Sequence, residues 1–185
     1  AVRDRQVSAL AAILKPDELA NVRRAAERIA SLGRHLRLPL AALAVQPLRL
    51  ASESFRDTFR HNLLALAKAD HTLDLFEFAL LRTVDKNLAP VSARRTPIRY
   101  FRKPEVAGFA RVLFSALAHT GHAGRPDLAA ASYRAAAQGF LNEPEGSPLP
   151  IEACGPVALG PALDALRLAS PSLKKALLDA AAAGV

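Results

Sequence analysis

The chain has no methionine and no tryptophan, a single cysteine, and few aromatic residues, which make up 5% of it. The one cysteine, Cys154, cannot form a disulfide within the chain, so a reducing compartment is expected. The longest apolar run, residues 38–45, is shorter than the about 20 residues that a membrane-spanning helix needs. Because the chain begins at Ala1 and lacks methionine, we expect it to be a fragment excised from a longer protein.

Alanine and leucine dominate the composition instead. Of the 185 residues, 51% are apolar, and few of these are β-branched or aromatic. Alanine and leucine are among the strongest helix formers, and a chain of this length can bury a sizeable core. No alternating pattern of useful length indicates a strand. The sequence therefore predicts an all-α fold, a multi-helix orthogonal or bundle domain of about eight to nine helices.

Proline, glycine and capping residues divide the chain into successive helices, with Ser52 and Ser170 as expected N-caps. We expect an N-terminal helix pair (1–36), a helical core (37–143), and a linker with a C-terminal helix pair packed on the core (144–185). Pro47 should kink or split its helix, and the helix over 74–88, apolar on most sides, should be central and buried. The expected helices cover residues 3–14, 15–32, 39–50, 53–69, 74–88, 104–119, 126–139, 157–168 and 172–183.

Three acidic residues, Asp70, Asp74 and Glu77, lie where one apolar helix ends and the next begins. With Asp74 as N-cap and Glu77 three residues later, the pattern predicts a capping box, in which each side chain accepts the other residue's main-chain N–H. Leu73 and Phe78 would then form a hydrophobic staple. The alternative is a small divalent-cation site formed by the three carboxylates. The spacing does not match an EF-hand loop.

A basic loop is the main candidate for a binding surface. Residues 92–104 carry five basic side chains and no acidic one. Clustered arginines among aromatic residues can contact phosphates and stack on bases, or meet anionic lipid head groups. The alternative is a solvated loop whose aromatic residues pack onto the helices. The candidate residues are Arg94, Arg95, Arg99, Tyr100, Phe101, Arg102 and Lys103.

Sequence motifs for catalysis are absent. The chain contains no HExxH, no G-x-S-x-G, no phosphate-binding loop and no G-x-G-x-x-G. His119 and His122 are close in sequence, but a metal site needs three or four converging ligands. Cys154 lies in a linker without an adjacent base or cation, so a nucleophile is not expected there. No catalytic residue and no cofactor is therefore assigned to this chain.

The stretch "ALAKADHTLDLFEFALLR" resembles the TerB-like motif, A-D-G-x-hydrophobic-x-x-x-E. Asp70, Leu73 and Glu77 match this motif, and His71 stands where it has glycine. Together with "LRLPLAALAVQPLRLAS", "IRYFRK" and "VLFSALAHTGH", the stretch resembles the C-terminal, non-catalytic region of bacterial HtpX-like zinc metallopeptidases. The resemblance covers about residues 37–140.

The resemblance implies an accessory domain of a membrane-bound, zinc-dependent protease that acts in membrane-protein quality control. Zinc and the catalytic residues would belong to a catalytic domain of the same polypeptide. The domain itself would be a soluble part of an inner-membrane protein on the cytoplasmic side, with an anionic membrane surface or a protein substrate as partner. Two alternatives stay open: a stand-alone binding module, for nucleic acid or an anionic surface, that uses 94–103, and a divalent-ion sensor that uses the acidic turn.

Overall fold

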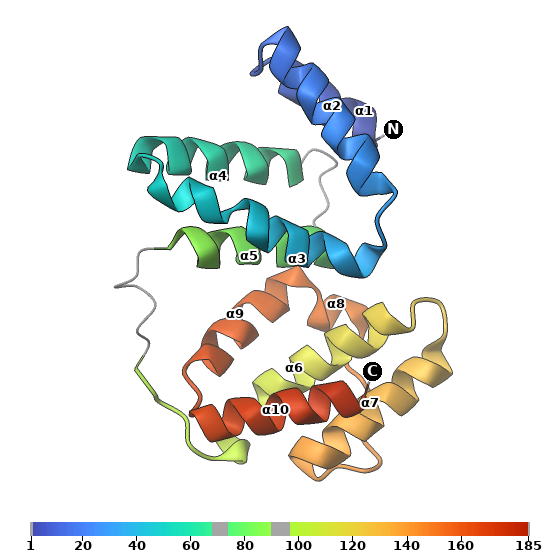
Figure 1. Ribbon diagram of the computed structural model, residues 1–185. Coiled ribbons are helices and arrows are strands. Elements are labelled where there is room, and N and C mark those ends of the chain that lie inside the picture. Colours follow the sequence, from blue (N-terminus) through green and yellow to red (C-terminus); the bar gives the residue numbers. More distant parts are fainter. Residues whose placement is uncertain (1, 68–73, 90–96, 185) are drawn as a thin grey trace. The chain divides into compact units, whose positions relative to one another are not determined.

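A computed structural model of the chain describes residues 2–67, 74–89 and 97–184. Within these ranges the secondary structure is helical, apart from turns, short extended stretches and an isolated β-bridge between Tyr100 and Ala169 (Figure 1). The all-α fold that the composition predicts is therefore confirmed. The nine helices expected from proline and glycine positions each have a counterpart, and the structure adds a short helix inside the C-terminal linker.

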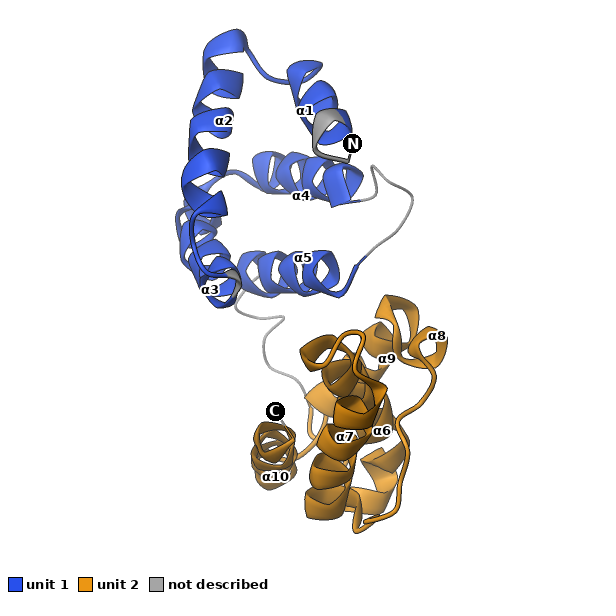
Figure 2. Cartoon of the chain, turned by 90° about the vertical axis from the view of Figure 1, so that its right-hand side faces the viewer, with its two compact units in different colours: residues 1–91 blue, residues 92–185 orange. Residues whose placement is uncertain are grey.

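The chain divides into two compact units, residues 1–91 (unit 1) and 92–185 (unit 2) (Figure 2). The sequence placed boundaries near residues 36 and 143 instead, so the division falls inside the expected core of 37–143. The reason lies in which helices pack together. The helix that follows the acidic turn packs within unit 1, whereas the helix that follows the basic loop packs on elements later in the chain.

Unit 1 has a small apolar core formed by residues that follow α3 and by residues of η1, α4 and α5. Val45, Val84 and Leu88 are buried there, and Phe59 and Leu63 pack against them. The elements of unit 1 are α1 (Val2–Ala11), α2 (Pro16–Ala30), α3 (Arg34–Ala44), the 3-10 helix η1 (Gln46–Leu50), α4 (Glu53–Ala67) and α5 (Leu75–Leu88).

The third helix departs from the expected bounds of 39–50. Helix α3 begins at Arg34 and continues through Pro39, and it ends at Ala44. Pro47 then lies in the first turn of the separate element η1, where a missing N–H costs no intrahelical hydrogen bond. The split predicted at Pro47 is thus confirmed, but the helix before it is longer than the sequence indicated.

Helix α5 is central only within unit 1. It packs on α3, α4 and η1, but Phe78, Val84 and Leu88 are its only buried residues. The expectation that 74–88 is central and buried therefore holds for its place among the helices of unit 1, but not for most of its side chains. An apolar helix surface becomes buried only when other elements cover it, and the elements packed on α5 leave most of its side chains partly exposed.

Unit 2 has the larger core, and α6 lies at its centre. Helix α6 packs on α7, α8, α9 and α10, and the buried side chains include Phe114 and Phe140. The rings of these two phenylalanines meet edge to face with centroids 6.0 Å apart. The elements of unit 2 are α6 (Lys103–Gly121), α7 (Pro126–Leu141), α8 (Ile151–Cys154), α9 (Pro156–Arg167) and α10 (Pro171–Ala183).

Local capping signals in the sequence are reproduced at two helix starts. The Ser52 hydroxyl accepts the N–H of Phe55 at 3.2 Å, and the Ser170 hydroxyl accepts the N–H of Leu173 at 3.3 Å. Pro171 follows Ser170 in the first turn of α10. A serine N-cap satisfies one of the N–H groups that a helix start leaves unpaired, so these bonds depend on sequence alone.

Candidate functional site

The acidic turn forms the capping box that the sequence predicts. Asp74 is the N-cap of α5, and its Oδ1 accepts the Glu77 N–H at 2.7 Å. In return, Glu77 Oε2 accepts the Asp74 N–H at 3.2 Å. Asp70 and Leu73 lie outside the described residues, so the three-carboxylate cation site and the hydrophobic staple stay predictions. In the ranges that are described, no three His, Cys, Asp or Glu side chains gather as a metal site.

Replacing Asp74 with alanine is expected to lower the free energy of unfolding of unit 1 by about 1 kcal/mol, because the Glu77 N–H loses its acceptor. Urea unfolding followed by circular dichroism measures this loss. The control is Asp57→Ala, since Asp57 is exposed on α4 and lies 3.9 Å from its arginine partner. Stabilisation of the wild type, but not of Asp74→Ala, by added Ca²⁺ would contradict a purely structural role for Asp74.

The described part of the basic loop, residues 97–103, is named the basic segment here. Its main chain is non-helical up to Arg102 and is bound to the corner between α9 and α10. The N–H groups of Arg99 and Tyr100 donate to the Leu168 carbonyl at 2.8 and 3.3 Å, and the Ser170 N–H donates to the Tyr100 carbonyl at 2.8 Å. These bonds hold the segment in one course along unit 2. Arg94 and Arg95 lie outside the described residues.

Side chains of the basic segment divide between the core and the solvent. Tyr100 is half-buried and packs toward Phe109, with ring centroids 6.3 Å apart. Phe101, in contrast, is 64% exposed, and Ile98 is 48% exposed. The Arg99 guanidinium carbon lies 5.7 Å from the centroid of the Tyr100 ring. The expectation that both aromatic residues could pack inward therefore holds for Tyr100 alone.

The basic residues at the start of α6 have different environments. The Lys103 ammonium lies 5.1 Å from the Phe140 ring centroid and donates to the Gly139 carbonyl at 3.4 Å. Arg102 is exposed at the N-cap position. Arg99 and Arg102 are thus exposed in the same short segment as the exposed apolar residues Ile98 and Phe101.

Glu105 anchors the end of the basic segment. Its Oε2 accepts the N–H groups of Phe101 at 2.9 Å and Arg102 at 2.8 Å. These two main-chain hydrogen bonds, the Arg102 bond first, hold the pKa of Glu105 below its ordinary value of 4.5. The ionised carboxylate therefore helps to fix the course of the segment that carries the exposed arginines.

The stability of unit 2 should consequently fall on acidification below pH 4.5, the ordinary pKa of Glu105. A lowered folded-state pKa contributes stability above the unfolded-state value, and this contribution is lost as the pH falls through the folded-state value. Glu105→Gln should show a smaller loss of stability between pH about 6 and about 3 than the wild type does. Urea unfolding monitored by tyrosine fluorescence measures it. Glu145→Gln, an exposed site after α7, is the control and should keep the wild-type pH dependence.

His119 and Cys154, the other candidates from the sequence, have contacts that stabilise the fold. His119 Nε2 is 2.8 Å from the Leu149 carbonyl, and the buried Ser115 hydroxyl accepts the Leu149 N–H at 2.9 Å, so both tie the linker to α6. Cys154 is buried at the end of α8, and desolvation, followed by the charge of Glu152, raises the pKa of its thiol. A raised thiol pKa disfavours the nucleophilic thiolate.

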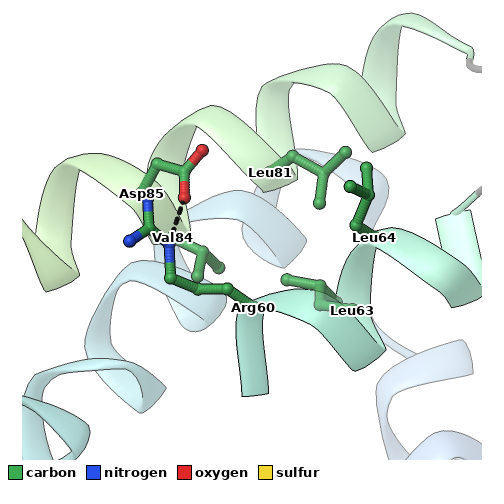
Figure 3. A pocket seen from close by; sticks show the side chains of 6 residues that line it. All are labelled: Arg60, Leu63, Leu64, Leu81, Val84 and Asp85. Atoms are coloured by element: carbon green, nitrogen blue, oxygen red, sulfur yellow. Dashed lines mark hydrogen bonds and ion pairs between the residues drawn. The ribbon is translucent and has the colours of Figure 1, made fainter. Parts of the chain in front are cut away.

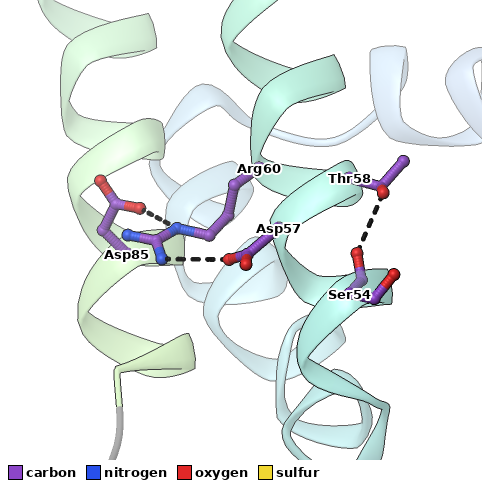
Figure 4. Close-up of polar contacts among 5 residues, drawn as sticks. All are labelled: Ser54, Asp57, Thr58, Arg60 and Asp85. Carbon is purple, nitrogen blue, oxygen red and sulfur yellow. Dashed lines mark hydrogen bonds and ion pairs between the residues drawn. The ribbon is translucent and has the colours of Figure 1, made fainter.

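A pocket of about 250 Å³, called the α4–α5 pocket below, lies between these two helices of unit 1 (Figure 3). Arg60 reaches from α4 across its rim, and its Nε donates to Asp85 Oδ1 of α5 at 2.8 Å (Figure 4). The Thr58 hydroxyl bonds to the Ser54 carbonyl within α4 at 2.9 Å. The lining residues are Arg60, Leu63, Leu64, Leu81, Val84 and Asp85.

Sequence reasoning missed this pocket. Arg60 and Asp85 are separated by 25 positions, and neither belongs to a motif of fixed spacing. The only available signal was the pair of apolar helices joined by the acidic turn, which indicates antiparallel neighbours. Such a pattern does not reveal where two helices leave space between them.

No family model, curated protein or solved structure matches the chain. The resemblance to HtpX-like metallopeptidases and to the TerB-like motif therefore stays a prediction. Among the described helices, none combines the length and apolar content needed to cross a bilayer.

Proposed function

We propose that the chain is a non-catalytic, helical accessory domain of a membrane-bound zinc-dependent protease, and that its basic segment contacts an anionic membrane surface. The observation that carries this proposal is the exposure of Phe101 and Ile98 beside Arg99 and Arg102 on a main chain fixed by hydrogen bonds. A fixed main chain presents these side chains without first having to be ordered on binding.

The chemistry of the segment fits the boundary of an anionic bilayer. Apolar side chains gain free energy by entering the region between head groups and acyl chains, while basic side chains attract anionic head groups. Phe101 can supply the first contribution, and Arg99 and Arg102 the second. Anionic lipids are concentrated in the cytoplasmic leaflet, so this proposal places the domain on the cytoplasmic side of the inner membrane.

The protease context rests on the sequence resemblance. In this context the zinc and the catalytic residues belong to another domain of the same polypeptide, which is the first partner of the chain. The accessory domain would hold protein substrates or dock the catalytic part in membrane-protein quality control. Sequencing the reading frame upstream of Ala1 tests this context. An HExxH motif there is expected, and a reading frame without one would overturn the protease assignment.

Flotation of the whole chain with lipid vesicles tests the membrane contact. We expect binding to phosphatidylcholine vesicles that contain about one third phosphatidylserine, and little binding to pure phosphatidylcholine. Equal binding to both kinds of vesicle would contradict an electrostatic contribution of the arginines. Binding to neither kind would contradict the proposed membrane contact. Tighter binding to a short DNA duplex than to the anionic vesicles would support the nucleic-acid module instead.

A further inference from the structure

The α4–α5 pocket is apolar at its base and polar at its rim. Val84 is 3% exposed and belongs to the small core of unit 1, and Leu63 packs against that core. Leu64 is 39% exposed. Water in this space therefore meets aliphatic side chains, and an apolar guest that displaced it would gain free energy.

The size of the pocket limits what can fill it. Sites for drug-sized ligands and cofactors have volumes of about 300–1,000 Å³. At about 250 Å³, this pocket is below that range and has room for one large side chain, such as leucine, phenylalanine or tryptophan. A guest of this size would complete the incompletely filled contact between α4 and α5, in line with the close packing of protein interiors.

The rim offers hydrogen bonds that suit a main chain. The Arg60 and Asp85 side chains are 45% and 52% exposed, so both can reach a guest. Their mutual contact occupies Arg60 Nε and Asp85 Oδ1, and Arg60 Nη1 lies 3.9 Å from Asp57 Oδ1. A guanidinium has five N–H donors and a carboxylate has two acceptor oxygens, so a donor and an acceptor are left over. A peptide unit, with one C=O and one N–H, matches this pair.

We propose that the α4–α5 pocket binds one large apolar side chain of a polypeptide segment, with the segment's main chain lying over Arg60 and Asp85. The occupant is thus an unfolded or extended protein segment rather than a free apolar molecule. This inference goes beyond the proposed membrane contact, because the pocket belongs to unit 1 and the basic segment to unit 2. It rests on the part of the proposed function in which the domain holds protein substrates. Failure of vesicle binding would leave the pocket unaffected, and failure of ligand binding would leave the membrane contact unaffected.

The test uses N-acetyl-L-tryptophanamide, which carries one large apolar side chain and two amide groups. The chain has no tryptophan, so excitation of the indole reports only on this ligand. Its fluorescence anisotropy should rise and saturate as the protein is added. The comparison ligand, 3-methylindole, has the same ring without amides and should bind about tenfold more weakly, because the rim hydrogen bonds are lost.

Two variants should close the pocket. Leu81→Phe adds a ring at the lining, and Leu64→Phe does so at a more exposed position; each should weaken binding about tenfold or more. The control Leu128→Phe lies on α7 in unit 2, where Leu128 is 44% exposed, and should bind like the wild type. Circular dichroism checks that each variant is folded. If Leu81→Phe does not fold, the binding measurement on Leu64→Phe alone tests the pocket.

Asp85→Ala tests the hydrogen bonds at the rim separately from the apolar contacts at the base. It should weaken N-acetyl-L-tryptophanamide binding without changing the affinity for 3-methylindole. Equal affinities of the two ligands for the wild type would overturn the assignment to a polypeptide. An anisotropy that does not saturate, or undiminished binding to a folded Leu64→Phe variant, would overturn the binding site itself.

Discussion

Replacing Phe114 with alanine is expected to lower the free energy of unfolding of unit 2 by about 3–5 kcal/mol. Phe114 is 1% exposed on α6, and its ring packs edge to face on Phe140 of α7. Truncation removes apolar burial and also leaves a cavity that the surrounding helices can fill only in part. Because α6 contacts every other helix of unit 2, the cavity would lie at the centre of that unit.

Tyrosine fluorescence during urea unfolding measures this effect without interference from unit 1. The two tyrosines, Tyr100 and Tyr133, both lie in unit 2, and the chain has no tryptophan. The matched control is Phe101→Ala, which removes the same ring from a site that is 64% exposed. Its effect should stay within about 0.5 kcal/mol. A similar loss in both variants would contradict the burial that distinguishes the two phenylalanines.

Replacing both Arg99 and Arg102 with glutamine should weaken binding to anionic vesicles about thirtyfold. Each basic residue near such a surface contributes about 1 kcal/mol, and about 1.4 kcal/mol corresponds to a factor of ten in affinity. Both residues are exposed in the segment that carries the exposed Phe101 and Ile98. Vesicle flotation over a range of lipid concentrations gives the affinity ratio.

The control variant for this prediction has the same net charge as the Arg99→Gln, Arg102→Gln double variant. Arg125→Gln with Arg134→Gln also removes two exposed positive charges from unit 2, at positions outside the basic segment. This variant should bind nearly as the wild type does. Equal weakening in the two double variants would show that net charge alone attracts the chain. In either case the affinity should fall as salt is added, since ions screen exposed charges.

Features that depend on neighbours within a few positions were predictable from the sequence. Composition specified the helices, and Ser52, Asp74 and Ser170 marked helix starts whose side-chain hydrogen bonds the structure contains. The box between Asp74 and Glu77 is the clearest case at the candidate sites, because both partners lie within one helical turn. Such bonds need no tertiary contact, so the residue types and their spacing are enough.

Burial, by contrast, depended on residues far apart in the chain. The sequence treated Tyr100 and Phe101 alike, but the contacts of the segment with Leu168 and Ser170 leave one half-buried and the other exposed. It favoured 74–88 as a buried helix, whereas the helix with the larger buried surface is α6, which α7, α8, α9 and α10 cover within unit 2.

The sequence by itself therefore determined an all-α chain, its helix starts and a basic segment between two groups of helices. Only the tertiary structure decided where the chain divides into units, which aromatic side chain stays in solvent, and that α4 and α5 leave a pocket between them. The physical reason is the distance along the chain over which each interaction acts. Helix propensity and capping act over about four residues, whereas burial and cavities arise from packing between elements that the local pattern does not specify.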